Sequence, residues 1–280
     1  MIGVTIGIGD KFRFYAERAA MHFREKSGLD CYIITEDHYK EVKSHPVFRC
    51  AIDEKEKICF LKFFLHDFFP NEGIVYFDCD WQMLRKYSFH HPDKLLVVRD
   101  RTEHLLIGKE VKAADHFNYF NAGFMISGCE MKPLFDRCKE DAHLIPRKYY
   151  DQCVWNNLVE KTGVQVQCLH RIFNTMDMGR GLFYTETVGL HNGYNYNQYD
   201  GQTVLGYCES EEPIQNFLIR QRELAGLYRI YRGNSYYTIY LHPDGTTSDG
   251  MYWIDRGKGV EIYNITGHQR YEFDKLVRLD

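Results

Sequence analysis

Short apolar runs alternate with amphipathic stretches over the first 170 residues or so. Residues 4–8 form an apolar run that ends at Gly9-Asp10, and apolar residues then recur at helical spacing until Gly28. Further strands are expected at 31–35, 74–77, 95–98 and 124–127, and further helices at 56–69, 133–142 and 152–161. This alternation predicts an α/β fold with a mainly parallel sheet and helices on both faces.

The pattern changes after about Gly226. The runs TIYL, MYWI and VEIYN are separated by HPDGTTSDG and DRGKG, which is typical of an antiparallel meander with tight turns. We therefore expect three parts: an α/β domain over 1–210, a connecting helix over 211–226, and a small antiparallel β module over 227–280. The module has no catalytic motif, and packing against the first domain is at least as good an interpretation of it as ligand binding.

Composition and charge argue against several classes of protein. With 280 residues and a net charge of −4, the chain has room for one sizeable domain and lacks the basic balance of a nucleic-acid binder. The start of the chain is typical of a strand and helix rather than a signal peptide, and no run is long enough to span a bilayer. Nine cysteines without CxxC spacing favour reduced thiols in the cytoplasm over a disulfide framework or a structural zinc site.

Acidic residues follow several of the expected strands. Asp78 and Asp80 come directly after the strand IVYF, and Asp10 and Asp100 follow two others. Because ligands bind at the carboxyl ends of parallel strands, these acids are expected at one edge of the sheet. Two carboxylates one residue apart suit Mg²⁺ or Mn²⁺, which can bridge the phosphates of a nucleotide diphosphate. The alternative is a pair of solvated loop acids that cap the next element.

Several segments, taken in order, resemble the GT-A glycosyltransferases, most closely the family-8 retaining enzymes typified by bacterial galactosyltransferases and glycogenin. They are FLKFFLHDFFP, YFDCD, VVRD, YFNAGFMI and YYDQCVWNNL. The resemblance covers about residues 1–195. It implies a GT-A (nucleotide-diphospho-sugar transferase) fold for the first domain, with a UDP-sugar as donor and Mn²⁺ or Mg²⁺ as metal.

The resemblance also implies roles for individual residues. Lys62 would contact the ribose or phosphates of the donor, and Asp100 would bind the transferred sugar. Asn121 and Ala122 would line the sugar pocket. Gln152 would lie beneath the anomeric carbon, where an amide can steady positive charge but is a poor nucleophile. Asp151 would bind donor or acceptor hydroxyls, unless it serves as the N-cap of the following helix.

The third metal ligand is expected to be His191, in the segment VGLHNGYNYN. The family's HxxGxxKPW pattern is matched only in part, because the Gly is one residue early and the Lys and Trp are missing. The Lys normally neutralises the leaving diphosphate, so Arg171, Arg180 or a residue of the C-terminal module would have to replace it. A turn residue is the alternative interpretation of His191.

The first strand carries GIGD, which matches neither a dinucleotide-binding motif nor a phosphate loop. We interpret this segment as a base-binding edge, with backbone groups of Ile6 and Ile8 and the side chain of Asp10 near the uracil. A close-packed turn is an equally good interpretation. The adjacent pair His90-His91 is interpreted as a surface turn, because neighbouring loop residues rarely converge on one metal.

Taken together, the sequence predicts a retaining hexosyltransferase that moves a sugar from a UDP-sugar to a hydroxyl acceptor. The acceptor can be a polysaccharide, a lipid-linked glycan, a protein or a nucleic acid, although nothing favours the last. Two rival functions remain open. One is a sugar-phosphate nucleotidylyltransferase, which needs a Gly-rich basic loop after the first strand. The other is a non-catalytic nucleotide-sugar or glycan-binding protein.

Overall fold

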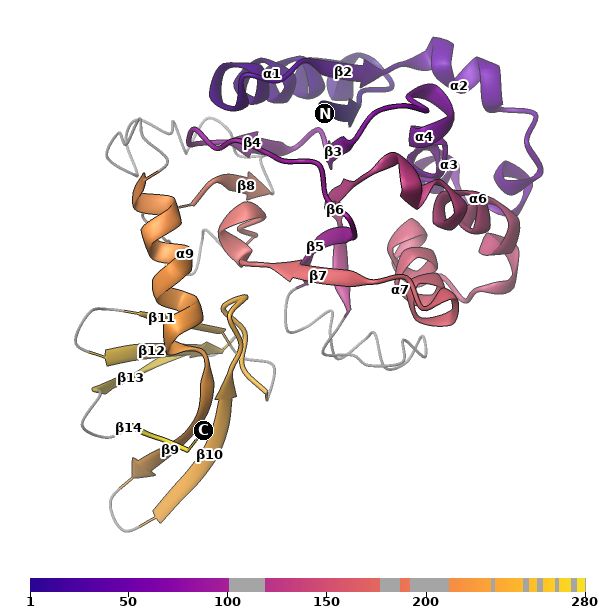
Figure 1. Cartoon of the computed structure of the whole chain (residues 1–280). Helices are drawn as coiled ribbons and strands as arrows, with labels where there is room; N and C mark the ends of the chain where they lie inside the picture. Colours follow the sequence, from indigo (N-terminus) through magenta and orange to yellow (C-terminus); the bar gives the residue numbers. More distant parts are fainter. Residues whose placement is uncertain are drawn as a thin grey trace.

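The computed structural model describes residues 1–100, 119–176, 187–191, 212–232, 235–248, 252–255, 259–264, 267–272 and 276–279. In Figure 1 the N-terminal part forms a sheet with helices around it, and α9 leads from there toward the strands of the C-terminal part. The predicted boundary between the first domain and the connecting helix, at residues 210 and 211, lies outside the described residues.

A six-stranded mixed sheet forms the centre of the N-terminal part, with strand order β2-β1-β3-β6-β5-β7. Its strands are β1 (Ile2–Ile6), β2 (Cys31–Ile34), β3 (Ile74–Phe77), β5 (Leu95–Arg99), β6 (Phe120–Ser127) and β7 (Val166–Leu169). Neighbouring strands are parallel except at β6, which is antiparallel to β3 and β5. The predicted mainly parallel sheet is confirmed. Because β6 runs the other way, its first residues lie at the same edge as the ends of β3 and β5.

Helices cover both faces of this sheet, as predicted. The long helix α1 (Asp10–Ser27) buries Ala19, Ala20 and Phe23 against Val75 and Phe77 of β3. The opposite face of β3 packs against the remaining helices of this region. These elements are α2 (Glu36–Val42), α3 (Glu54–Phe60), α4 (Leu65–Phe68), α6 (Lys132–Asp141) and α7 (Tyr150–Thr162), with 3₁₀ turns η1 (Pro46–Cys50), η2 (Leu61–Phe64), η4 (Cys129–Met131), η5 (Ala142–Leu144) and η6 (Arg171–Phe173).

The continuous helix predicted over 56–69 is wrong in one respect. The chain there forms α3, then η2, then α4, so a tight 3₁₀ turn interrupts the helix. All four residues of η2 are buried. The apolar run favoured a helix but could not reveal the interruption, since short 3₁₀ turns share its hydrophobic pattern. The turn matters because it carries Lys62 into the interior.

A second, two-stranded sheet lies beside the first and was not predicted. It pairs β4 (Trp81–Met83) with β8 (Gly189–His191) in antiparallel fashion, and Trp81 faces His191 in the register. A β-carbon on Gly189 would lie 2.2 Å from the Trp81 ring, so only glycine allows this approach. This pairing brings a late segment of the chain next to the residues that follow β3.

The C-terminal part contains two three-stranded antiparallel sheets, in agreement with the predicted meander. They are β10-β9-β14 and β11-β12-β13. The elements are α9 (Glu212–Leu224), β9 (Gly226–Arg232), β10 (Ser235–Leu241), β11 (Tyr252–Asp255), β12 (Gly259–Asn264), β13 (Gly267–Glu272) and β14 (Leu276–Arg278).

One turn of the C-terminal part contacts the N-terminal sheet. The Arg99 guanidinium at the end of β5 lies 2.6 Å from an Asp244 carboxylate oxygen. The amide of Arg171 donates to the Asp244 carbonyl, and the ring of His170 lies over Gly245. These contacts support the interpretation that the C-terminal module packs against the first domain.

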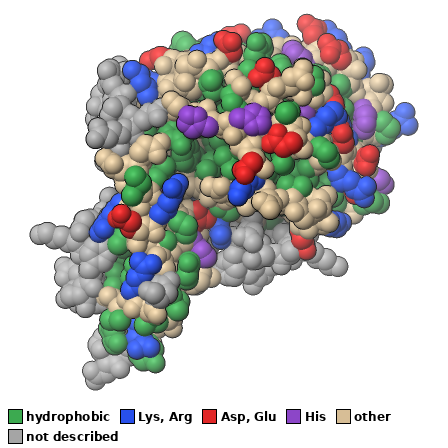
Figure 2. Space-filling view, in the orientation of Figure 1, with side chains coloured by type: hydrophobic (Ala, Val, Ile, Leu, Met, Phe, Trp, Pro, Cys, Tyr) green, Lys and Arg blue, Asp and Glu red, His purple; other side chains and the backbone are tan. Residues whose placement is uncertain are grey.

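The described helices include none that is long and apolar enough to cross a membrane. On the face shown in Figure 2, Lys and Arg side chains are interspersed with Asp and Glu. Among the described residues of that face, the picture shows no continuous basic surface of the kind that phosphate backbones favour.

The buried His66 predicts a pH-dependent stability. Its Nε2 lies 3.0 Å from the Ser127 hydroxyl, and burial lowers its pKa from 6.5 to about 4. Between those values the unfolded chain binds more protons than the folded chain. The free energy of unfolding is therefore expected to fall, by about 1.4 kcal/mol per pH unit from this one group, as pH drops from 6.5 toward 4.

Urea unfolding at several pH values measures this slope. His66→Gln should flatten it, and His143→Gln, at an exposed position, is the matched control. Equal slopes for wild type and His66→Gln would contradict the assignment.

Candidate metal and sugar site

Three side chains from two elements converge at the carboxyl edge of the central sheet. Asp78 and Asp80 follow β3, and His191 ends β8. Their potential ligand atoms all lie within 4.8 Å of one another. The His191 Nε2 atom is 3.6 Å from Asp78 Oδ2 and 3.3 Å from Asp80 Oδ1. Two carboxylates and an imidazole form a ligand set that suits Mn²⁺, and they fit the metal that the resemblance implies.

The two oxygens of Asp78 have different surroundings. Oδ1 accepts a hydrogen bond from the Tyr76 hydroxyl at 2.5 Å and lies 3.3 Å from the Lys62 ammonium. Oδ2 faces His191 instead. With one oxygen anchored by two donors, the other is held in place toward the ligand cluster. Preorganisation of this kind lowers the cost of gathering like charges around an ion.

An outer hydrogen bond sets the orientation of His191. Its Nδ1 lies 3.0 Å from the side-chain oxygen of Asn174. An amide oxygen can only accept, so Nδ1 carries the hydrogen and Nε2 presents its lone pair to the acids when the ring is neutral. Asn174 in turn donates to the Asn121 side-chain oxygen at 3.1 Å. This chain of hydrogen bonds links the histidine to the start of β6.

Gly123 provides the space for the cluster. A β-carbon at this position would lie 2.3 Å from His191 Cε1 and 2.7 Å from Asp78 Oδ2. Gly123 also accepts the backbone amide hydrogen of Asp78 through its carbonyl, which fixes the start of the DxD segment against β6. The glycine of the NAG segment is therefore required by a close approach of side chains to the backbone.

Mutual attraction shifts the titration of the cluster. Burial alone would raise the pKa of Asp80, but the adjacent His191 outweighs it and lowers that pKa below its usual value. Burial would likewise lower the pKa of His191, yet Asp80 and Asp78 raise it above its usual value. Asp80 and His191 therefore stabilise each other's charged forms, and a bound cation would take the place of the proton on His191 Nε2.

A second cluster of polar side chains lies on the same sheet edge. Gln152 Nε2 donates to Asp100 Oδ2 at 2.5 Å, and Asn121 Nδ2 donates to Asp100 Oδ1 at 3.4 Å. Gln152 Oε1 accepts from Asn121 Nδ2 and from the amide of Ala122. Asp100 is fully buried, and Asn121 and Gln152 are nearly so. The structure thus brings four of the predicted sugar-binding residues together.

Lys62 and Asp151 form a buried ion pair beside this cluster. The Lys62 ammonium is 3.0 Å from Asp151 Oδ2 and donates to the Ala122 carbonyl at 3.2 Å. Burial raises the pKa of Asp151 to about 6 against the opposing effect of Lys62. Burial acts to lower the pKa of Lys62, but Asp151 and Asp78 hold it above its usual value. Lys62 therefore supplies the fixed positive charge between two acids.

The helix-capping interpretation of Asp151 is wrong. Helix α7 begins at Tyr150, and its N-cap is Tyr149, which makes no side-chain cap hydrogen bond. Tyr150 has a φ of 44°, an uncommon value for a residue with a side chain. This backbone turn immediately precedes Asp151 and Gln152, and strained backbone of this kind clusters at functional sites.

The residues predicted to bind the base lie along the end of β1. Ile6 is its buried last residue and Ile8 is half-buried. Asp10 is the exposed first residue of α1. Since β1 and β3 are parallel neighbours, these positions share the edge that carries the DxD segment. Their contact with a base stays a prediction.

Sequence reasoning missed two residues that the structure places in the site. Asn174 is fully buried behind His191, and no motif surrounds it. Tyr76 could have been found, because residues two apart in a strand point to the same face, as Tyr76 and Asp78 do.

Arg180, a candidate for the role of the missing Lys, lies outside the described residues. Arg171, another candidate for the role of the missing Lys, is a buried side chain with 3% of its surface exposed.

No protein-family model matches the chain, and no curated protein matches it in sequence. Solved structures match its fold. The galactosyltransferase LgtC in complex with donor and acceptor sugar analogs gives a TM-score of 0.53 at 14% identity, over 77% of this chain and 100% of that one. An active-site mutant of LgtC gives 0.52 at 14% identity, over 76% and 99%. The bifunctional glycosyltransferase WbbM gives 0.51 at 12% identity, over 68% of this chain and 45% of WbbM.

These similarities establish the architecture. The mixed, mostly parallel sheet with helices on both faces and additional antiparallel β-structure matches the GT-A fold, as predicted. At identities of 12% to 14% the likeness concerns the fold. Function must be argued from the site itself.

Asn174 provides a test of the outer hydrogen bond. Asn174→Ala removes the acceptor for the His191 Nδ1–H and is expected to weaken Mn²⁺ binding by roughly 10- to 100-fold, the usual cost of losing such a partner. Isothermal titration with MnCl₂ measures the change. Asn157→Ala is the matched control, because Asn157 is also buried but donates to the Cys153 carbonyl within α7. Equal losses in the two variants, or none in Asn174→Ala, would contradict the role of Asn174.

Proposed function

We propose that this chain is a metal-dependent glycosyltransferase that moves a hexose from a UDP-sugar to a hydroxyl acceptor with retention of anomeric configuration. The observation that carries the proposal is the convergence of Asp78, Asp80 and His191 at the sheet edge, beside the buried Asp100, Asn121 and Gln152. The fold similarity to LgtC, solved with donor and acceptor sugar analogs, supports the same reaction class. The cytoplasmic setting favoured by the cysteines belongs to this proposal.

In this proposal Asp78, Asp80 and His191 hold Mn²⁺ or Mg²⁺, which neutralises the charge that develops on the leaving diphosphate. Tyr76 and Lys62 keep one oxygen of Asp78 in place. The remaining polar residues orient the sugar. Asp100 accepts hydrogen bonds from the hydroxyls of the donor sugar. Its carboxylate is held in a fixed orientation by hydrogen bonds from Gln152 and Asn121.

Gln152 is proposed to steady the reacting centre without bonding to it. Its amide oxygen already accepts two hydrogen bonds and its nitrogen donates to Asp100. These bonds fix the amide dipole, which favours electrostatic support of an oxocarbenium-like sugar over nucleophilic attack. Retention then follows from departure and attack on one face of the sugar, guided by the leaving phosphate. Asp151 acts through Lys62, with which it forms a buried ion pair.

Neither rival function has a comparable observation in its favour. A nucleotidylyltransferase needs a basic Gly-rich loop after the first strand. Here Gly9 is held by Glu36, which accepts its backbone amide hydrogen at 2.7 Å and also pairs with Arg13. The basic side chain at this turn is therefore already paired with a carboxylate. A binding protein without turnover would share the metal site, so an activity measurement must separate the two.

The test is release of UDP from UDP-glucose and UDP-galactose with Mn²⁺, with and without candidate glycan acceptors. We expect slow hydrolysis without acceptor, faster release with the right acceptor, and a loss of more than roughly 100-fold in Asp78→Asn and Asp80→Asn. Asp136→Asn, which removes a surface ion pair with Lys132, is the control. Donor binding without turnover would point to a binding protein. Incorporation of UTP and a sugar phosphate into product would point to a nucleotidylyltransferase.

Gln152→Glu tests the proposed electrostatic role. The substitution keeps the shape of the side chain but places a second carboxylate beside Asp100, and it removes the donor of a 2.5 Å hydrogen bond. We expect kcat to fall by roughly 100-fold, the order seen when a preorganised donor is lost, with a smaller change in KM. The exposed Gln167→Glu on β7 is the control. An unchanged kcat would show that Gln152 does not act at the reacting centre.

A further inference from the structure

A second cluster of metal-ligand side chains lies away from the candidate site. It consists of His91, in the loop between β4 and β5, and of Cys129 and Glu130, which open η4 directly after β6. Because β6 is antiparallel to β3, Ser127 at its end pairs with Ile74 at the start of β3. The cluster therefore lies at the opposite edge of the sheet from Asp78, roughly 15 Å away along β3 at the usual rise of a strand.

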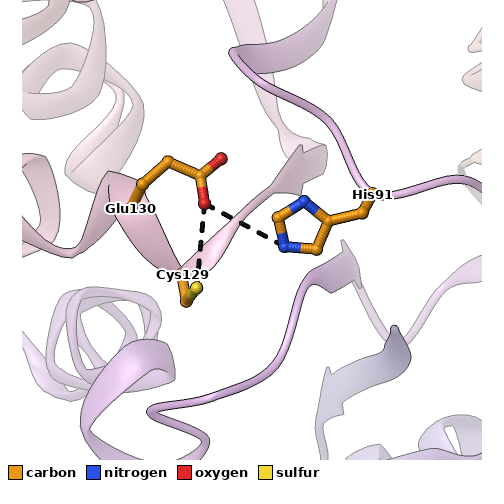
Figure 3. Close-up of side chains that lie close together, drawn as sticks. All are labelled: His91, Cys129 and Glu130. Atoms are coloured by element: carbon orange, nitrogen blue, oxygen red, sulfur yellow. Dashed lines mark hydrogen bonds and ion pairs between the residues drawn. The ribbon is translucent and has the colours of Figure 1, made fainter.

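The three side chains point toward one another (Figure 3). Cys129 Sγ is 3.7 Å from Glu130 Oε2, and His91 Nε2 is 4.0 Å from the same oxygen. All three ligand atoms lie within 4.8 Å of one another. In a tetrahedral zinc site with ordinary bond lengths, ligand atoms are about 3.4 to 3.6 Å apart. Small side-chain movements would bring this cluster to that spacing.

Two glycines make room for the cluster. The Glu130 carboxylate folds back over Gly128, where a β-carbon would lie within 2.4 Å of both of its oxygens. The His91 ring lies against Gly73, where a β-carbon would come within 2.8 Å of Cδ2. Both side chains thus lie close against backbone positions that carry no β-carbon.

The direct contacts alone give little reason for this arrangement. An ion pair at 4.0 Å between half-exposed groups contributes little to stability in water. A thiol is a weak hydrogen-bond donor, so the Cys129 contact to Glu130 adds little more. A cation bound between the three groups would convert weak contacts into coordinate bonds.

We propose that His91, Cys129 and Glu130 bind Zn²⁺, with a water molecule as the fourth ligand. The combination of thiolate, imidazole and carboxylate favours zinc, whereas the all-oxygen preference of Mg²⁺ excludes that ion. On binding, the Cys129 thiol loses its proton to solvent and the sulfur becomes a thiolate ligand. The bound ion ties the β4–β5 loop to the turn after β6, which strengthens the side of the sheet far from the sugar site.

The sequence argued against zinc because the cysteines lack CxxC spacing and the adjacent histidines resemble a surface turn. That reasoning holds for His90 and His91, since only His91 belongs to the cluster among the described residues. The adjacent Cys129 and Glu130 do converge, because the Glu130 carboxylate folds back over Gly128 toward the thiol. What spacing could not show is that β6 returns Cys129 and Glu130 to the same loop. Ligands that meet through the sheet leave no local motif.

Co²⁺ titration tests the proposal, since cobalt in a zinc site with a thiolate ligand gives a charge-transfer band in the near ultraviolet. The full chain, kept reduced without added thiols, should develop the band as Co²⁺ is added and lose it when Zn²⁺ is added. Cys129→Ser should abolish the band, and His91→Ala should weaken Co²⁺ binding by roughly tenfold or more. His90→Ala is the matched control and should bind like wild type.

Asp80→Asn separates this cluster from the sugar site, since its titration should still give the band. No band in wild type, a band that survives Cys129→Ser, or a loss in His90→Ala equal to that in His91→Ala would overturn the proposal. A band that disappears in Asp80→Asn would also overturn it, because cobalt would then be bound beside Cys79. Circular dichroism of each variant confirms that the chain is folded.

Discussion

The gathering of carboxylates at one edge of the central sheet constrains the rest of the site. Asp78, Asp80, Asp100 and Asp151 all lie there. Two like charges 4 Å apart repel by about 4 kcal/mol in the partly polar surroundings typical of such sites. The protein offsets this with the Lys62 ammonium between Asp78 and Asp151, and with His191 beside Asp80. A divalent cation would supply the charge that these two groups do not.

Three structural devices bring the groups together. The antiparallel direction of β6 places Asn121 and Gly123 at the ends of β3 and β5. The β4–β8 pair returns His191 to the residue after Asp80. The 3₁₀ turn η2 carries Lys62 inward. Hydrogen bonds from Asn121 through Asn174 to His191 then join the sugar-binding and metal-binding groups into one connected network.

The sequence predicted the parts of this arrangement that depend on local pattern. IVYF followed by DCD identified β3 and its acids, and the alternation of apolar runs predicted five of the six strands of the sheet, all but β7, and most of its helices. The β4–β8 pair escaped because its two three-residue strands are held by long-range pairing, and short strands have almost no periodic signal. Asn174 escaped for a similar reason, since its role exists only once His191 lies beside it. The cluster of His91, Cys129 and Glu130 likewise depends on the course of β6.

The most direct measurement of the central claim is anomalous X-ray scattering at the manganese edge from crystals soaked with UDP and Mn²⁺. The account predicts a manganese peak bounded by Asp78, Asp80 and His191, with electron density for a diphosphate in contact with it. A peak that lies elsewhere, or UDP bound at this edge with no manganese beside it, would contradict the claim that these three residues hold the cation that grips the donor.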